Sequence, residues 1–253
     1  MNQTVRDYSA FDRASESIWN VRMYDDIVST MLERCAPFSD GSSFSIEQAH
    51  ILDVGCGPGG MTLALLRQTR VASVSLLDLR KEGLERAADR IHSHDGDLPV
   101  HLLQADVHAI PVKDNQFDFI FSRGSQRFWE DQCTAFSELR RVLKKGGIAY
   151  IGGGRGSTAF QELRLREDGE WCATVQEQER RFLRTLPMHI LDDAAYEALF
   201  NAWGDRYRIF SHTGDGHWFC WQKSSEAIDG GRGFPSVKCA EYGEAGDRGG
   251  DNR

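Results

Sequence analysis

The chain has 253 residues, of which 40% are hydrophobic and 27% are charged, and its formal net charge is −8. This length and composition are typical of one globular domain with a substantial core, alone or with tails. The negative charge disfavours nucleic acid as a partner, because phosphate binding needs clustered lysine and arginine. No apolar run approaches the ~20 residues of a membrane span, and the polar N-terminus lacks a signal-peptide pattern, so we expect a cytoplasmic protein.

The cysteines and histidines show no spacing that is typical of a disulfide framework or a metal site. We therefore expect no metal, and reduced, mostly buried thiols at Cys35, Cys56, Cys133, Cys172, Cys220 and Cys239.

Residues 1–45 are predicted to form an N-terminal helical lid or cap, because apolar side chains recur at helical spacing from Asp12 to Cys35. Residues 37–45, rich in Ser, Gly and Asp, are predicted to be a loop. Two interpretations of the helical part stay open. It is either packed on the edge of a sheet, or it closes over a ligand with side chains from Tyr8, Phe11, Trp19 and Tyr24.

The stretch from His50 to Leu66 reads as a buried strand, a glycine turn and a helix start. Glycines let the backbone turn tightly and let a ligand approach main-chain N–H groups at the N-terminus of the helix. The spacing of Gly55, Gly57 and Gly59 fits a nucleoside-binding turn, and Gly60 completes a dinucleotide-binding pattern as well. The glycines alone leave both ligands open, together with a turn that binds nothing.

Two carboxylates are predicted at the ends of the next strands. A second strand, 71–77, ends at Asp78, which lies 23 residues after Gly55 and near the offset of a ribose-binding carboxylate. The alternative role for Asp78 is the N-cap of a helix over 81–93. A third strand, 100–105, ends at Asp106, which could accept from an exocyclic amine while Val107 or Leu79 packs against the ring, or could be a turn residue.

The loop after a fourth strand, 117–122, is expected to face the reacting end of a ligand, because open α/β sheets bind ligands beyond the carboxyl ends of their strands. A helix over 135–143 follows, closed by 144–147 with a left-handed glycine cap. A fifth strand, 148–151, then runs into the glycines at 152–154.

The remainder is predicted as a charged helical insert at about 155–205, then two strands, 207–212 and 217–222, joined by a hairpin turn at 213–216. Residues 224–253 have the composition of a disordered tail.

Residues 46–223 resemble the class I S-adenosylmethionine-dependent methyltransferases. The likeness lies in Leu52-Asp-Val-Gly-Cys-Gly-Pro-Gly-Gly, Leu76-Leu-Asp78, Ala105-Asp106-Val, Phe117-Asp-Phe-Ile-Phe-Ser and Leu139-Arg-Arg-Val-Leu-Lys-Lys-Gly-Gly. It implies a doubly wound α/β fold with a mostly parallel seven-stranded sheet, an antiparallel last strand and helices on both faces. The terminal hairpin and the Leu-Lys-x-Gly-Gly turn are features of that family and decide against NAD.

The resemblance also implies how S-adenosyl-L-methionine would bind. Gly55, Gly57 and Gly59 would border its amino-acid part, with Asp53 near the ammonium and Ser122 beside the methionine portion. Asp78 would hold the ribose and Asp106 the adenine amine. The loop after the fourth strand lacks the Asn/Asp-Pro-Pro-aromatic motif of nucleobase N-methyltransferases, which disfavours that reaction.

The leading prediction is in-line methyl transfer to a small-molecule acceptor, in which the enzyme mainly positions the reactants. Arg123 could bind a carboxylate in a bidentate manner, or it could form a surface salt bridge. Trp19 or Trp129 could face the sulfonium by cation–π attraction, or they could pack in the core. A rival enzyme would attack the aminocarboxypropyl arm of the cofactor and release methylthioadenosine. A third possibility is a non-catalytic cofactor-binding regulatory subunit. The acceptor and the oligomeric state stay open.

Overall fold

The computed structural model describes residues 16–39, 45–168, 189–211 and 213–225. The predicted tail, Tyr8, Phe11 and the middle of the helical insert lie outside these residues. The strands are β1 (His50–Val54), β2 (Ser73–Asp78), β3 (Val100–Gln104), β4 (Phe117–Arg123), β5 (Leu143–Gly153), β6 (Arg206–Phe210) and β7 (His217–Gln222). The helices with defined bounds are α2 (Ile18–Ser39), α3 (Gly60–Gln68), α4 (Lys81–His94), α5 (Gln132–Val142) and α7 (Asp193–Trp203).

The strands form a seven-stranded sheet in the order β3-β2-β1-β4-β5-β7-β6. Neighbouring strands from β3 to β5 pair in parallel, and β7 runs antiparallel to both β5 and β6. The predicted fold class is therefore confirmed. The order reverses between β1 and β4, and in open α/β sheets such a switch point opens a crevice beyond the carboxyl ends of the strands.

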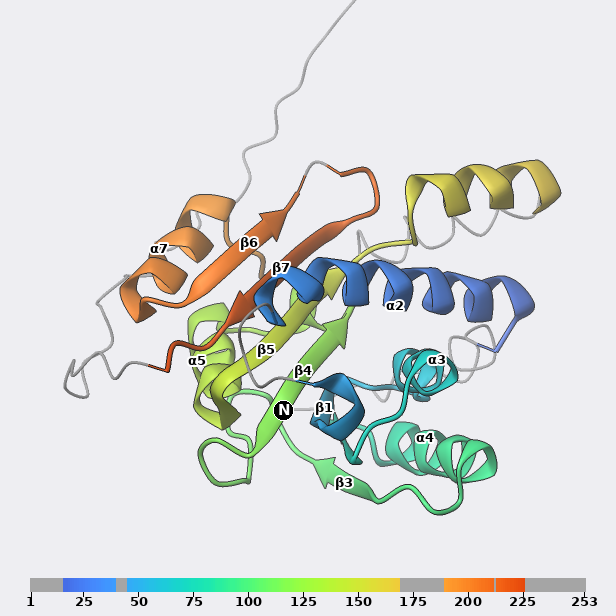
Figure 1. Cartoon of the computed structure of the whole chain (residues 1–253), viewed down its shortest axis with the longest axis horizontal. Helices are drawn as coiled ribbons and strands as arrows, with labels where there is room; N and C mark the ends of the chain where they lie inside the picture. Colours follow the sequence, from blue (N-terminus) through green and yellow to red (C-terminus); the bar gives the residue numbers. More distant parts are fainter. Residues whose placement is uncertain (1–15, 40–44, 169–188, 212, 226–253) are drawn as a thin grey trace, which may run out of the picture.

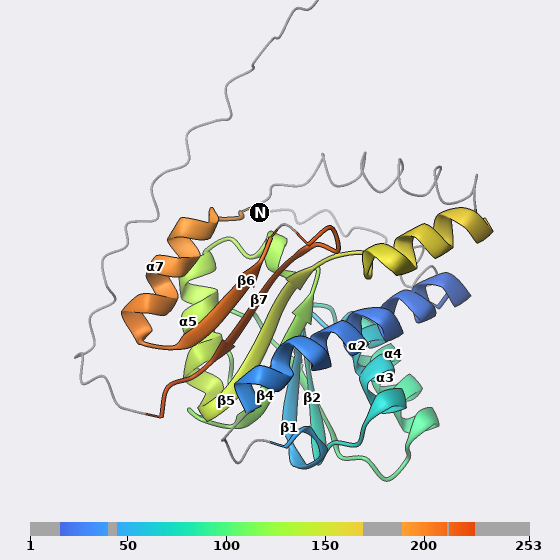
Figure 2. The ribbon, with the colours of Figure 1, turned by 45° about the horizontal axis from the view of Figure 1, so that its top comes forward.

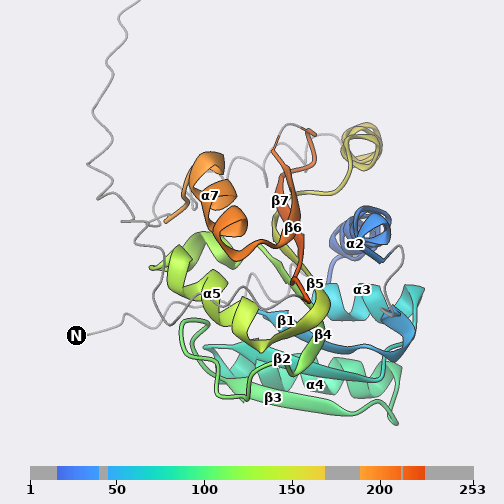
Figure 3. The same cartoon turned by 60° about the vertical axis from the view of Figure 1, so that its left-hand side comes forward.

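Helices lie on both faces of the sheet (Figure 3), and one cluster of apolar side chains packs on each face. One cluster packs α2, α3 and α4 against side chains such as Ile51, Phe119 and Trp218. The other packs α5 and α7 against the alternate side chains, such as Leu52 and Ile120. The alternation follows from the strand period of two, and it points Asp53 to the same face as Ile51, toward α3.

Helix α2 is a single helix that crosses the sheet beside α3 (Figure 1), and it runs through Pro37 to Ser39, so the predicted start of a loop at residue 37 was wrong. Its side chains from Met23 to Phe38 contribute to the core. Residues 158–168 form a helix alongside α2 (Figure 2), and Trp19 packs against Phe160 with the ring centroids 6.3 Å apart.

The predicted boundary between the helix over 135–143 and the strand over 148–151 was also wrong. The helix begins at Gln132, where the Asp131 side chain accepts from the Thr134 N–H, and it ends at Val142. Leu143 is already extended and pairs with Phe117, and the register then steps to Phe119 and Ile148. Residues 144–147 thus form a bulge within β5, in which Gly146 has a φ of 76°, rather than a helix cap.

Candidate cofactor site

The glycine turn connects β1 to α3 and leans toward β2. The N–H groups of Gly55 and Cys56 both donate to the Leu77 carbonyl, at 2.7 and 3.1 Å. The φ angles of Gly55, Gly57 and Gly59 are 66°, 50° and 78°, and residues other than glycine rarely adopt such values. The sequence at this turn is therefore dictated by the backbone.

The glycines at 55 and 57 have different surroundings. A Cβ atom on Gly55 would lie 2.3 Å from the Cβ of Ser125, so this glycine permits the loop after β4 to pack on the turn. A Cβ atom on Gly57 would meet nothing within 4 Å. Gly57 consequently presents an open backbone surface against which a ligand can lie.

Asp78 faces this turn from the end of β2. Its Oδ2 accepts from the Gly57 N–H at 2.8 Å and its Oδ1 accepts from the Arg80 N–H at 2.9 Å. The N-cap of α4 is Arg80, so Asp78 does not serve that helix in the predicted alternative role. Because a carboxylate has about four acceptor positions, two oriented oxygens still leave capacity for vicinal hydroxyl groups.

Asp53 lies beneath the turn and is 2% exposed. Thr62 of α3 donates its hydroxyl hydrogen to Asp53 Oδ2 at 2.7 Å. Burial raises the pKa of Asp53 to about 7, against the opposing effect of the Thr62 bond, and the nearby charge of Asp78 raises it further. A buried carboxyl group poised near neutrality favours a cationic partner, such as an ammonium group.

The ends of β2 and β3 lie side by side and carry the other predicted residues. The Ala105 N–H donates to the Asp78 carbonyl, and Gln104 Nε2 donates to the Leu79 carbonyl, both at 3.3 Å. Leu79 is 66% exposed, whereas Val107 is buried. The Asp106 side chain is 54% exposed. An exposed leucine between two carboxylates offers an apolar face for a flat ring.

The loop after β4 is fixed to the end of β1. Ser122 and Ser125 donate to the Val54 carbonyl at 2.7 and 3.1 Å, and their hydroxyl oxygens lie 2.6 Å apart. The Ser122 hydroxyl is thus used for packing, and Ser122 is fully buried. Sequence reasoning missed Ser125, because a contact between distant segments carries no local signal in the sequence.

Arg123 lies between α2 and the end of β5. Its guanidinium donates to the Gly154 carbonyl from Nε and Nη2, at 3.3 and 2.9 Å, and lies 5.3 Å from the centroid of the Tyr24 ring. In the described part of the chain it has no carboxylate partner. Tyr24 in turn packs on the start of α3, where a Cβ atom on Gly60 would lie 2.6 Å from its ring. The two side chains therefore connect α2 to the glycine turn.

The two candidate tryptophans each pack against other side chains of the protein. Trp129 is buried and packs edge to face on Phe136, 5.9 Å between centroids, within the cluster of α5. Trp19 has Arg22 over its ring at 4.6 Å and Phe160 beside it. The surroundings of Trp129 favour the alternative of core packing.

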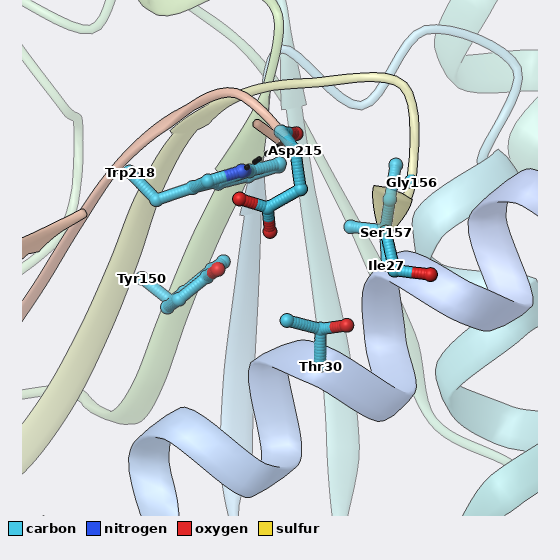
Figure 4. A pocket seen from close by; sticks show the side chains of 7 residues that line it. All are labelled: Ile27, Thr30, Tyr150, Gly156, Ser157, Asp215 and Trp218. Atoms are coloured by element: carbon cyan, nitrogen blue, oxygen red, sulfur yellow. Dashed lines mark hydrogen bonds between the residues drawn. The ribbon is translucent and has the colours of Figure 1, made fainter. Parts of the chain in front are cut away.

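A shallow hollow lies between α2, β5 with the segment that follows it, and the start of β7. Figure 4 shows Tyr150, Asp215 and Trp218 facing Thr30 across it. Arg34 binds Asp215 at 3.0 Å and the Tyr150 hydroxyl at 3.0 Å. The hollow has no room for a nucleoside, and none of the predicted site residues lines it.

Among the described residues no group of three His, Cys, Asp or Glu side chains is placed to hold a metal ion. No helix in these ranges is both long enough and apolar enough to span a membrane.

Comparisons with known proteins agree with this architecture. A family model described as a methyltransferase domain matches residues 52–151. A malonyl-[acyl-carrier protein] O-methyltransferase of Halorhodospira halophila is 31% identical over 196 residues, which are 76% of this chain and 60% of that protein. The rice 2-methyl-6-phytyl-1,4-hydroquinone methyltransferase 1, chloroplastic, is 32% identical over 101 residues, 40% of this chain and 29% of that protein. The chain thus spans less than two thirds of these relatives.

A solved structure has a similar fold over nearly the whole chain. It is a putative S-adenosyl-L-methionine-dependent methyltransferase of Methanococcus maripaludis, with a TM-score of 0.64 and 26% identity, and the alignment covers 90% of this chain and 99% of that one. The sheet order, the matched methyltransferase domain and these similar proteins together support a class I S-adenosylmethionine-dependent methyltransferase.

Proposed function

We propose that this protein binds S-adenosyl-L-methionine across the glycine turn and transfers its methyl group to a small-molecule acceptor. The observation that carries the proposal is the hydrogen bond between the open Gly57 and Asp78, which joins a ligand-accessible backbone to an oriented carboxylate. The exposed Leu79 and Asp106 extend the same surface along the ends of β2 and β3. These residues fit an adenosine whose ribose lies at Asp78 and whose amine lies at Asp106.

The cofactor supplies a methyl group on a sulfonium, and the residues of the chain position it. Asp78 accepts from the ribose hydroxyls as charge-assisted hydrogen bonds, while Gly57 lets the ligand approach the backbone. Asp53 attracts the ammonium group from beneath the turn. In-line displacement depends on positioning, so Asp53 and Asp78 would contribute by holding the two ends of the cofactor.

Arg123 is the candidate for a carboxylate of the acceptor or of the cofactor. One edge of its guanidinium is held by the Gly154 carbonyl, and its face lies over Tyr24, so the group is oriented without a charge partner in the described residues. A guanidinium oriented in this way suits bidentate binding of a carboxylate. The small-molecule acceptor class is supported by the names of the relatives, which act on a malonyl group carried by a protein and on a hydroquinone.

The test is binding of S-adenosylhomocysteine, measured by calorimetry, to wild type, D78A and the control D89A. Asp89 is exposed on α4 and lies outside the site. We expect D78A to lose on the order of 1.5–3 kcal/mol of affinity and D89A to bind as wild type does. Equal affinities for all three proteins would refute the assignment.

The products then identify the reaction. Incubation with the cofactor and a pool of candidate acceptors should yield S-adenosylhomocysteine and a product heavier by one methyl group. Release of methylthioadenosine would instead assign the aminocarboxypropyl reaction. Tight binding with neither product would favour a regulatory subunit.

A further inference from the structure

His108 is held between the adenine-binding candidate Asp106 and the start of α5. Its Nδ1 lies 2.5 Å from Asp106 Oδ1, and its Nε2 lies 3.1 Å from the backbone nitrogen of Asp131. Its own backbone N–H also donates to Asp106 Oδ1, at 2.9 Å. One carboxylate oxygen therefore receives two hydrogen bonds from a single residue.

These partners select one state of the imidazole. The backbone N–H of Asp131 can only donate, so Nε2 has to accept and carries no proton. The Asp106 carboxylate can only accept, so Nδ1 has to carry the proton and donate. The neutral Nδ1–H tautomer satisfies both bonds. The Asp131 carboxylate does not compete for the ring, because it binds the backbone N–H and hydroxyl of Thr134.

The arrangement leaves the second oxygen of Asp106 available. In the described part of the chain, Oδ2 has no hydrogen-bond partner, and the side chain is 54% exposed. The bonds from His108 also lower the pKa of Asp106, against the opposing effect of partial burial, so the carboxylate stays ionised. An ionised, oriented oxygen accepts from an amine and repels the lone pairs of a carbonyl.

We propose that His108 is a positioning residue that sets the selectivity of the site for a 6-amino over a 6-oxo purine. It does so by fixing Oδ1 of Asp106 and aiming Oδ2 at the purine edge. This inference rests on the proposed function, since it assumes that the adenine of the cofactor lies at Asp106.

The experiment compares S-adenosylhomocysteine with S-inosylhomocysteine, in which an oxo group replaces the 6-amino group and N1 carries a hydrogen. The measured quantity is the ratio of their Kd values, by calorimetry, for wild type, H108A, H108N and the control H101A. His101 lies on β3 with an exposed side chain and no hydrogen bond among the described contacts. A loss of fold or a general weakening of binding changes both Kd values and leaves their ratio unmoved.

We expect wild type and H101A to share one ratio in favour of the amino purine, and H108A to lower it roughly three- to tenfold. H108N should recover much of the selectivity, because its amide nitrogen can occupy the position of Nδ1. In a D106A background, H108A should change nothing further, as expected of a residue that acts through Asp106.

An unchanged ratio in H108A, or an equal effect of H108A with and without Asp106, would overturn the inference while leaving the proposed function intact. Absence of S-adenosylhomocysteine binding by wild type would instead refute the proposed function, and the inference with it.

Discussion

The sulfur atoms of Cys35 on α2 and Cys220 on β7 lie 3.6 Å apart inside the core. Burial raises the pKa of the Cys35 thiol well above its ordinary value, and the contact with Cys220 raises it further. The contact seats the C-terminal half of α2 on the sheet. This packing favours the first of the two interpretations of the N-terminal helix, while the lid stays a prediction.

The reactivity of the cysteine thiols tests whether α2 detaches from the sheet in the native protein. In a C172A/C239A background, which removes the cysteines outside the described residues, Cys133 should react first with a thiol reagent, because it is only partly buried. Cys35, Cys56 and Cys220 should react only on unfolding, since buried neutral thiols are poor nucleophiles. Mass spectrometry of the labelled peptides gives the order. Rapid labelling of Cys35 in the native protein would show that α2 detaches, as a lid would.

The two glycines of the turn should respond differently to alanine. G55A places a methyl group 2.3 Å from the Ser125 Cβ, so we expect a marked loss of thermal stability. G57A meets no atom within 4 Å and should cost only about 1–2 kcal/mol of backbone strain, while its methyl group would occupy the space proposed for the ligand. Thermal melts together with S-adenosylhomocysteine binding separate these effects.

The double variant G55A/S125G serves as the control, because it removes the colliding side chain and should recover part of the lost stability. If G57A binds the ligand as wild type does, the ligand does not lie against this turn.

Asp53 should make the stability of the protein fall as pH rises through the acidic range. The unfolded carboxyl has a pKa of ~3.9 and the folded one about 7, so between these values only the folded state retains the proton. Stability is therefore highest below the unfolded pKa and declines until the folded pKa is passed. D53N lacks this dependence. As the pH rises from 4 to 7, the free energy of unfolding of D53N should increase relative to that of wild type by on the order of a few kcal/mol.

Urea unfolding at a series of pH values gives this difference directly. A difference between D53N and wild type that does not change with pH would mean that the pKa of Asp53 is not raised.

The ion pair between Arg140 and Asp205 should stabilise the attachment of the terminal hairpin. Arg140 binds both carboxylate oxygens, at 2.8 and 3.0 Å, and the Ser224 N–H donates to Oδ1 at 3.0 Å. We expect D205A to lose about 2–4 kcal/mol of unfolding free energy, less than a fully buried pair, because Arg140 is 26% exposed. D114A, which breaks the exposed pair with Arg141, should lose under ~1 kcal/mol. Equal losses in chemical denaturation would contradict this ranking.

The buried strands could be predicted because continuous apolar runs mark buried parallel strands. Asp53 and Asp78 could be predicted because each lies at or near the end of such a run. The end of α5 could not be predicted, because Leu143 suits a helix and a strand equally. Its extended conformation depends on pairing with Phe117, which is distant in the sequence. Contacts between distant segments carry no local signal either. Nothing near Gly55 in the sequence indicates Ser125, and nothing near Trp129 shows that its ring is enclosed by α5.

The antiparallel direction of β7 determines which edge of the sheet the turn before it reaches. Since β7 starts beside Gly153 and finishes beside Ile148, the turn that precedes it meets the ligand-facing edge of the sheet, and the chain departs at the opposite edge. The Asp215 carbonyl abuts Gly154, whose own carbonyl holds Arg123. Changes in the 213–216 turn would therefore reach the surroundings of Arg123 without altering the proposed cofactor-binding residues Gly57 and Asp78, which lie much earlier in the chain.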